Sequence, residues 1–478
     1  MNGSKASYQS YGNVFHSKAE LYYPKTLTEL RQIVLDCRRQ QRRITPAGAF
    51  HSFDRQNSGN DVVISLQHFN QITYRAEDHT LCVGPGAKWG DIVEVAYRNK
   101  CMVYSCITCS QPTAGGTLSV NSYSMWTPGV GKEGNHCLEI QLMTTEGTLL
   151  TCSREQNADL FYGVVSGFGM LGFIVSITYQ LVYIGQHFEL QIAATDYPDI
   201  EQIEERLDLR KATGLDDWEK LRSQSTLFYV DNGQPKFTVY NRRYRLVEQE
   251  RKGSKFRLYQ AVLANGLIRI FPALVNTILK KDARRPTEKR WLLQGLKSIK
   301  EGTFWAEPDY YWTTYCSALF RPLGYKTHLY QMTHFIPTGE GKVTRFTKRV
   351  YELLAQYQLK FCMFDIMYIP QDEPFVLSTS RYTDGFHVNT TFMDYVDQAT
   401  LMKFYQQLNQ MTYEMGGKIY LAKNCFIEPE LLERMHQKEI EAFRQLKERY
   451  DPDFVLTSNF FETHFPHYFT PPTKQLTR

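Results

Sequence analysis

The chain has 478 residues, roughly three times the length of a common single domain, so we expect more than one core-bearing unit. Hydrophobic residues make up 42% and charged residues 22% of the sequence, a balance that excludes disordered and fibrous proteins. The net charge of +5 is small for this length and gives no electrostatic reason to expect a nucleic-acid partner.

The ten cysteines are irregularly spaced and lack the pattern of paired cysteines and histidines that marks a structural zinc site, so we expect no metal. Cys106 and Cys109 form a single CxxC pair. No thioredoxin-like βαβ pattern surrounds it, which argues against a redox pair. The opening residues 1–11 are polar and lack the apolar stretch of a secretory signal. We therefore expect free thiols and a cytoplasmic location.

The first part of the chain shows the periodicities of a mixed α and β unit. Helical spacing of apolar residues predicts helices at residues 28–40, 89–99 and 158–165. Short apolar runs bounded by turn residues predict strands at residues 61–66, 80–83, 138–144, 148–152 and 173–179.

The second part of the chain also mixes helices with strands. Helical patterns occur at residues 200–221, 342–356, 401–416 and 428–448. Strand-like runs occur at residues 237–245, 327–336, 361–368 and 385–392. Helices between antiparallel strands indicate a second α+β unit that completes a binding pocket.

Three glycine-rich turns in the first part predict a site for a large cofactor. They cover residues 46–52, 112–119 and 167–172. Small residues let backbone amides point into one concavity, where they bind a phosphate without a side-chain charge. The third turn spells GxGxxG, but its predicted helix comes before it and its strand after it, the reverse of a Rossmann site. Taken alone, each of these turns is more simply explained as an ordinary turn between two secondary-structure elements.

Residues 21–182 resemble the FAD-binding domain of the vanillyl-alcohol oxidase and p-cresol methylhydroxylase superfamily. The resemblance is carried by Tyr23-Pro24 and by residues 46–53, 83–89, 112–121, 157–161 and 167–178. In that superfamily the first two glycine-rich loops hold the FAD pyrophosphate, and the last segment lies against the cofactor. The resemblance implies a two-domain α+β flavoprotein with an FAD-binding domain of the PCMH type at residues 1–183. A substrate or cap domain would follow at 184–425, and residues 426–478 would help to complete the flavin pocket.

By this resemblance the cofactor-binding residues fall into three groups. The first loop supplies Ala47, Gly48, Ala49, Phe50, His51 and Ser52. The second loop and its continuation supply Pro112, Thr113, Gly115, Gly116, Ser119, Asn121 and Tyr123. The last segment supplies Gly169, Gly172 and Ile174.

The first loop is similar to the GxGHS loop of aldonolactone oxidases, alditol oxidases and cytokinin dehydrogenases. In those families the histidine is bonded to the 8α-methyl group of the flavin. His51 occupies that position, which implies covalent FAD. Decaprenylphosphoryl-ribose oxidases carry arginine there and bind FAD without the bond. A His51 that only lines the FAD site is therefore the alternative.

The second half resembles the decaprenylphosphoryl-ribose oxidases most. The resemblance lies in residues 329–337, in residues 416–423 and in the closing Asp451-Pro452. In that family the lysine at the Lys423 position and the tyrosine at the Tyr330 position lie beside the flavin, which implies catalytic roles for both. Without the family, Lys423 would be a solvated lysine at a strand end, and Tyr330 is as well explained as a core aromatic. The substrate-pocket residues implied are Gln331, His387 and Asn389.

Two departures from the family leave the substrate open. Tyr123 stands where most relatives carry a flavin-side histidine. Asn389 aligns roughly with the inhibitor-reactive cysteine of mycobacterial ribose oxidases. The stretch 104–111 also lacks the catalytic aspartate of cytokinin dehydrogenases, which argues against amine oxidation.

The resemblance implies FAD-dependent oxidation of a hydroxyl group by hydride transfer to flavin N5. The substrate would be a sugar, an alditol, an aldonolactone or a lipid-linked sugar, and no motif identifies the electron acceptor. Two alternatives stay open. One is reduction of a carbon–carbon double bond, as in the sterol reductases, and the other is a degenerate protein that binds flavin without activity.

Residues 258–279 are mostly apolar but carry a narrow polar stripe that includes Asn265, Arg269 and Asn276. Basic residues flank the segment on both sides. This pattern is typical of a helix that lies in a membrane interface, so we expect a peripheral membrane contact that would suit a lipid-linked sugar. A helix buried in the cap domain is the alternative.

Overall fold

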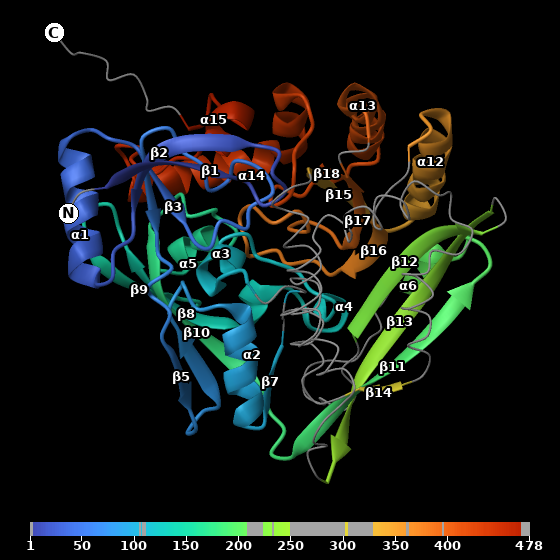
Figure 1. Ribbon diagram of the computed structural model, residues 1–478, viewed down its shortest axis with the longest axis horizontal. Helices are drawn as coiled ribbons and strands as arrows, with labels where there is room; N and C mark the ends of the chain where they lie inside the picture. Colours follow the sequence, from blue (N-terminus) through green and yellow to red (C-terminus); the bar gives the residue numbers. More distant parts are fainter. Residues whose placement is uncertain are drawn as a thin grey trace, which may run out of the picture.

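The computed structural model describes residues 3–104, 107, 111–207, 223–231, 234–248, 302–304, 328–359, 363–393 and 396–469. Within these ranges the chain forms two halves, each built on two β-sheets with helices packed against them (Figure 1). The predicted α+β class is confirmed. The predicted helix at 258–279, the end of the one at 200–221 and the Cys106–Cys109 pair lie outside the described residues.

The first sheet has the strand order β1-β2-β4-β3. Its strands are β1 (Ser4–Gln9), β2 (His16–Tyr22), β3 (Ile44–Ala47) and β4 (Val62–Ser65). Helix α1 (Leu27–Arg39) buries Leu30, Ile33 and Val34 in the core beside β3 and β4, as its apolar spacing predicts. Because β3 ends at Ala47, this sheet fixes the start of the first glycine-rich loop.

The second sheet has the order β5-β6-β10-β8-β9, and β7 pairs with the end of β10. Its strands are β5 (Ile72–Arg75), β6 (Thr80–Val83), β7 (Cys101–Val103), β8 (Cys137–Met143), β9 (Leu149–Ser153) and β10 (Phe173–Tyr183). The helices of this part are α2 (Trp89–Arg98), α3 (Ala114–Leu118), α4 (Thr127–Val130) and α5 (Ala158–Val164). The GxGxxG segment joins α5 to β10, which is the helix-to-strand order that the sequence predicts.

The second half begins with the sheet β12-β13-β11-β14. Its strands are β11 (His187–Tyr197), β12 (Ser223–Asp231), β13 (Gln234–Val247) and β14 (Gly302–Phe304). The short helix α6 (Ile203–Leu207) follows β11. Strand β12 lies along β16 (Met363–Ile369) of the next sheet, where Thr226 Oγ1 donates to the Ile366 carbonyl at 2.6 Å and accepts from its amide at 2.8 Å.

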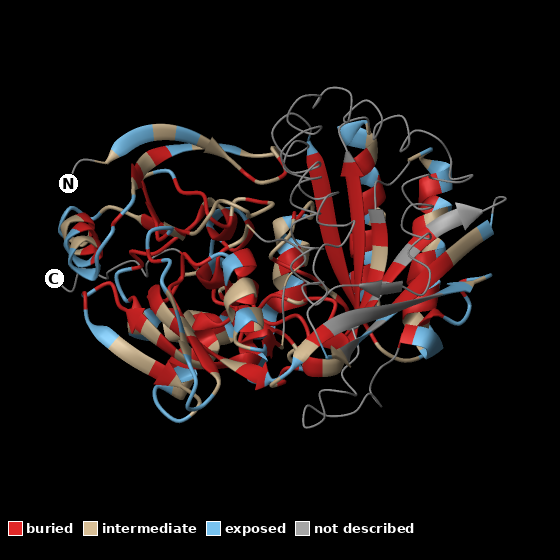
Figure 2. Cartoon of the chain, turned by 60° about the horizontal axis from the view of Figure 1, so that its bottom comes forward, coloured by how far each residue is buried: buried red, intermediate tan, exposed pale blue. Residues whose placement is uncertain are grey.

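The fourth sheet, which we call the cap sheet, has the order β16-β17-β15-β18. Its strands are β15 (Leu329–Pro337), β16 (Met363–Ile369), β17 (Gly385–Met393) and β18 (Lys418–Ile419). Helices α12 (Lys342–Gln356) and α13 (Gln398–Glu414) cover one face, where His334 Nε2 lies 3.0 Å from Asn409 Oδ1 on α13. Figure 2 shows β15 and β17 as buried strands, so polar residues on their other face must face a cavity or a partner.

The last described segment returns to the first half. Helix α14 (Pro429–Tyr450) is followed by a parallel bridge between Leu456 and Ile44 of β3, and then by α15 (Asn459–His464). The buried Lys447 ammonium donates to Asp451 at 2.5 Å and to the Leu456 carbonyl at 2.6 Å, which holds this return in place. None of the described helices combines the length and apolarity that crossing a bilayer requires.

Candidate active site

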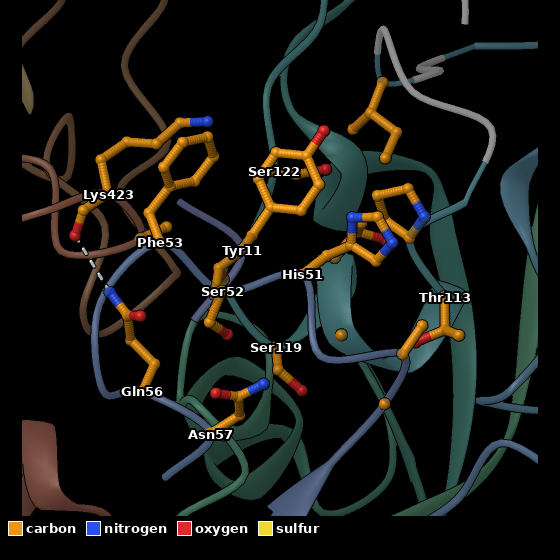
Figure 3. Close-up of a pocket in the computed structure, with 18 of the residues that line it drawn as sticks. Tyr11, His51, Ser52, Phe53, Gln56, Asn57, Thr113, Ser119, Ser122 and Lys423 are labelled. Carbon is orange, nitrogen blue, oxygen red and sulfur yellow. Dashed lines mark hydrogen bonds between the residues drawn. The ribbon is translucent and has the colours of Figure 1, made fainter. Parts of the chain in front are cut away.

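A cavity of about 510 Å³ lies where the two halves meet (Figure 3). Its walls come from the glycine-rich segments of the first half and from β15, β16 and β17 of the cap sheet. Every cofactor-binding residue implied by the family lines this cavity except Asn121. The side chain of Asn121 instead donates to Asp372 at 2.8 Å and accepts from the Gly134 amide at 2.9 Å, so it supports the loop from behind.

The glycine-rich segments approach each other so closely that side chains would not fit. A Cβ on Gly48 would lie 2.2 Å from Thr113 Oγ1, and one on Gly115 would lie 2.6 Å from Pro85 Cβ. Three stretches of backbone that are distant in sequence therefore form one wall of the cavity. Such a wall suits the pyrophosphate of a dinucleotide, because backbone amides can approach it without a side chain between them.

An aromatic group lies beside this wall. The His51 ring stacks on Tyr11, with 4.8 Å between ring centroids, and Tyr11 meets Phe53 edge to face at 5.3 Å. Tyr11 lies before the segment that resembles the FAD-binding domain, and sequence reasoning missed it. The turn after β1 brings it here, where its amide donates to the Ser52 carbonyl at 2.8 Å.

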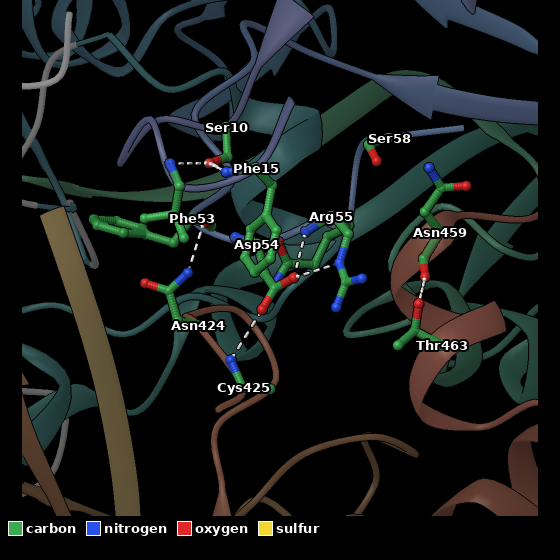
Figure 4. A network of polar contacts seen from close by, with 12 residues as sticks. Ser10, Phe15, Phe53, Asp54, Arg55, Ser58, Asn424, Cys425, Asn459 and Thr463 are labelled. Carbon is green, nitrogen blue, oxygen red and sulfur yellow. Dashed lines mark hydrogen bonds and ion pairs between the residues drawn. The ribbon is translucent and has the colours of Figure 1, made fainter. Parts of the chain in front are cut away.

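Polar contacts clamp the segment after β18 onto the first glycine-rich loop (Figure 4). The buried Asp54 carboxylate accepts from the Cys425 amide at 3.0 Å. Asn424 Nδ2 donates to the Phe53 carbonyl at 2.8 Å. Because these contacts flank Lys423, they set the position of its backbone relative to the His51 loop.

Lys423 lies in the cavity at the end of this clamp. Gln56 Nε2 donates to its carbonyl at 3.0 Å, and its Nζ lies 4.3 Å from the centroid of the Phe53 ring (Figure 3). A cation over an aromatic face is held electrostatically by the ring quadrupole. The structure therefore places this predicted catalytic lysine among the cavity residues, with its ammonium group positioned by Phe53.

A row of three polar residues crosses the cap sheet. Thr333, Asn389 and Asp365 are register partners on β15, β17 and β16, so their side chains share one face. Asn389 Oδ1 accepts from the Tyr123 hydroxyl at 2.9 Å and from Thr333, and its Nδ2 donates to Asp365 at 2.8 Å. Burial raises the pKa of Asp365 to about 6, opposed by the hydrogen bond from Asn389 and by the charge of Lys423. No motif marked Asp365 in the sequence.

Gln331 and Tyr330 point to opposite faces of β15. Gln331 lines the cavity, where its Nε2 donates to Thr391 at 3.1 Å and its Oε1 has no hydrogen-bond partner among the described residues. Tyr330 is buried on the helix side, with its ring 5.9 Å from Phe426. Side chains alternate along a strand, so both residues could not face the cavity. The structure thus corrects the expected position of Tyr330, which lies in the core and not beside the cofactor site.

His387 is the third implied pocket residue, and it does not line the cavity. Its ring lies behind Tyr123 at 4.5 Å and near Tyr420 at 4.9 Å, and its Nε2 lies 3.0 Å from Thr379 Oγ1. Burial holds the pKa of His387 well below its usual value, so the ring is neutral. Its place is that of a packing partner for Tyr123.

Glu133 is a buried carboxyl behind the cavity wall that sequence reasoning missed. It accepts from the hydroxyls of Ser122 at 2.6 Å, Thr117 at 3.0 Å and Tyr179 at 2.5 Å, and the first two of these residues line the cavity. Burial raises the pKa of Glu133 to about 7. In the sequence, Lys132-Glu133 between glycines has the appearance of a solvated loop, and only the packing shows that it is buried.

We expect Glu133→Gln to remove part of the pH dependence of stability. Between pH 4.5 and pH 7 the unfolded chain ionises this carboxyl while the folded chain keeps its proton, so the free energy of unfolding falls as pH rises. The pKa shift of Glu133 corresponds to a change of at most about 3 kcal/mol in the free energy of unfolding. Thermal unfolding from about pH 5 to about pH 8 measures it, with the exposed Glu155→Gln as control. Equal pH slopes for wild type and Glu133→Gln would contradict the expectation.

Sequence models of two families match the chain. The family described as FAD binding domain matches residues 19–153, and D-arabinono-1,4-lactone oxidase matches residues 344–464. The first match covers the first two glycine-rich loops, and the second covers Asp365, Asn389 and Lys423.

The chain is also similar to individual proteins of known name. The D-arabinono-1,4-lactone oxidase of Debaryomyces hansenii is 22% identical over 194 residues, which cover 37% of this chain and 35% of the relative. The L-gulonolactone oxidase of Bos taurus is 24% identical over 204 residues, or 42% of this chain and 45% of the relative. Cytokinin dehydrogenase 2 of Arabidopsis thaliana is 28% identical over 132 residues, which cover 27% of this chain and 26% of the relative. The chain thus spans less than half the length of each of these relatives.

The cavity geometry fits the cofactor that the family match requires. Backbone segments too close for side chains form one wall, and the polar face of the cap sheet forms another. The expected cofactor, FAD, is therefore confirmed by the FAD-binding match, and the residues around Gly48 and Thr113 are those that would hold it. The chain thus combines a PCMH-type FAD-binding domain with a lactone-oxidase-type domain, and the relatives that it matches are members of the vanillyl-alcohol oxidase and p-cresol methylhydroxylase superfamily.

Proposed function

We propose that this protein is an FAD-dependent oxidoreductase that oxidises a hydroxyl group of a sugar, an alditol, an aldonolactone or a lipid-linked sugar. The observation that carries the proposal is the single cavity in which the glycine-rich FAD loops face Lys423 and the polar row of the cap sheet. FAD, when bound, supplies a two-electron acceptor for the hydride of an alcohol carbon. The described residues supply what surrounds it: a polar face for a hydroxylated substrate and one cation.

The polar face favours a substrate with several hydroxyl groups. Gln331, Thr391, Asn389 and Asp365 present donors and acceptors to one cavity. A buried polar site loses affinity for an analogue that leaves these groups unpaired, so such a face selects hydroxylated ligands. Lys423 adds a positive charge that can stabilise negative charge developing on a substrate oxygen.

Anaerobic flavin bleaching tests the proposal. Purified protein should be yellow, and a member of a panel of polyols, lactones and prenyl-phosphate sugars should bleach it. Bleaching by NADPH and by none of the alcohols would favour the double-bond reductase. A colourless protein that does not take up FAD would favour a degenerate flavoprotein.

We also propose that the protein is cytoplasmic and lies at a membrane surface through residues 258–279. The support is the sequence pattern of an apolar segment with basic flanks, including Lys280 and Lys281. We expect anionic liposomes to carry the protein in flotation. The double variant Lys280→Ala/Lys281→Ala should bind these liposomes more weakly, because the basic residues that flank the segment attract anionic lipid. If neither anionic nor neutral vesicles carry the wild type, and residues 258–279 are protected in the soluble form, the alternative of a helix buried in the cap domain is favoured.

A further inference from the structure

Asp365 is a charged residue of the cavity whose environment points to a chemical role. Among the described residues that line the cavity, it supplies the one carboxylate and Lys423 the one ammonium group. Burying a carboxylate in a partly buried polar face costs free energy unless hydrogen bonds or an opposite charge compensate for the lost water. The described residues give Asp365 one hydrogen-bond donor, Asn389 Nδ2 at 2.8 Å.

The neighbours of Asn389 determine which way its amide faces. Its Oδ1 accepts from two hydroxyls, those of Tyr123 and Thr333. A flipped amide would place its oxygen against the Asp365 carboxylate, so the observed orientation is the one in which Asn389 donates to Asp365. This fixes one carboxylate oxygen and leaves Asp365 the capacity to accept a further proton or hydrogen bond, since a carboxylate offers about four lone-pair sites.

We propose that Asp365 is the base that takes the proton from the substrate hydroxyl, an inference that rests on the proposed function. The O–H bond breaks and its proton passes to the Asp365 carboxylate. The O–H electron pair forms the second bond of the product carbonyl, and the hydride that leaves the carbon would be taken up by FAD, which supplies the two-electron oxidant when bound. Gln331 Oε1, which has no partner among the described residues, is placed to accept from a second hydroxyl of the same substrate.

Three other titratable groups in or near the cavity are less suited to accept this proton. Lys423 in its ammonium form has three donors and no lone pair, so it can bind the oxygen but not deprotonate it. Burial raises the pKa of Tyr123, so it stays neutral. His387 lies behind Tyr123 and outside the cavity lining. Asp365, with a pKa of about 6, is ionised at neutral pH and close enough to that pH to exchange its proton.

The test combines kinetics with a measurement on the resting protein. With a hydroxyl substrate that bleaches the wild type, we expect the rate of flavin reduction to rise with pH through about pH 6. Asp365→Asn should lower this rate by about 10²-fold or more and flatten the pH profile. Infrared difference spectroscopy without substrate should show a carboxylic-acid band titrating through about pH 6 beside that of the buried Glu133, and only the band of Asp365 should be missing in Asp365→Asn. Asp384→Asn is the control, because Asp384 is a part-buried acid that lies immediately before β17 and outside the cavity lining.

A second variant guards against a purely structural effect. Asp365→Ala removes the carboxylate, and added formate should restore the rate at least about tenfold, since a small acid can take up the proton in the vacated space. If Asp365→Asn reduces its flavin at the wild-type rate with the wild-type pH profile, the proposal is wrong and the proposed function stands. If no alcohol bleaches the wild type, the proposed function fails and the proposal fails with it. If both variants lose FAD, Asp365 is structural.

Discussion

Lys423→Ala is expected to slow flavin reduction by substrate about 10²-fold or more while the FAD content stays near that of the wild type. The structure separates these two effects. The clamp that holds this segment uses the Lys423 backbone, which accepts from Gln56, together with the side chains of Asn424 and Asp54. Truncation of the Lys423 side chain leaves all of these contacts in place and removes the cation that lies over the Phe53 ring.

Stopped-flow reduction under anaerobic conditions measures the first effect, and the ratio of flavin to protein absorbance measures the second. The exposed Lys403→Ala on α13 serves as the matched control, since it removes the same charge from the surface. Loss of FAD or of solubility in Lys423→Ala would make Lys423 a structural residue. A wild-type rate would mean that its charge does not act on the substrate.

His51→Ala is expected to convert a covalently attached flavin into one that acid releases. His51 lines the cavity from the loop whose Gly48 packs against Thr113, and Tyr11 stacks on its ring. The ring is thus held against the cavity wall, and by the sequence resemblance it has the place of the histidine that bonds the flavin in aldonolactone oxidases. Covalent attachment removes the dissociation equilibrium of the cofactor, so the wild type should keep its yellow colour after acid precipitation.

In-gel flavin fluorescence and the intact mass decide this prediction. The wild-type mass should include FAD, and the His51→Ala mass should be that of the apoprotein, while the exposed His68→Ala should behave as the wild type. Flavin in the supernatant of the acid-treated wild type, together with an apoprotein mass, would show that His51 only lines the site. That is the arrangement expected if the chain follows the ribose oxidases.

The sequence by itself predicted features that depend on residues close together in the chain. The helix at 342–356 and the strand at 80–83 have the predicted bounds, because apolar periodicity is a local property that burial of one face preserves. The glycine-rich loops could be recognised for a similar reason. The first two are short stretches whose small residues are consecutive, and the structure brings them to one cavity wall.

Weakly patterned strands escaped prediction. Strand β1 (Ser4–Gln9) has mostly exposed or half-buried polar residues, and its pairing with β2 supplies the order that its own sequence does not show. The burial of Lys132 and Glu133 was hidden for a related reason. Their partners, Asp372 and Tyr179, are distant in the chain, so nothing in the local sequence separates them from solvated charges.

The polar row of the active site was decided by the tertiary structure alone. Thr333, Asn389 and Asp365 belong to three strands, and only the register of those strands aligns their side chains on one face. The same register turns Gln331 into the cavity and Tyr330 into the core, although the two are neighbours in the sequence. Because side chains alternate along a strand, one of the two must point away from the cavity. Which one does so depends on which face of the sheet helices α12 and α13 cover.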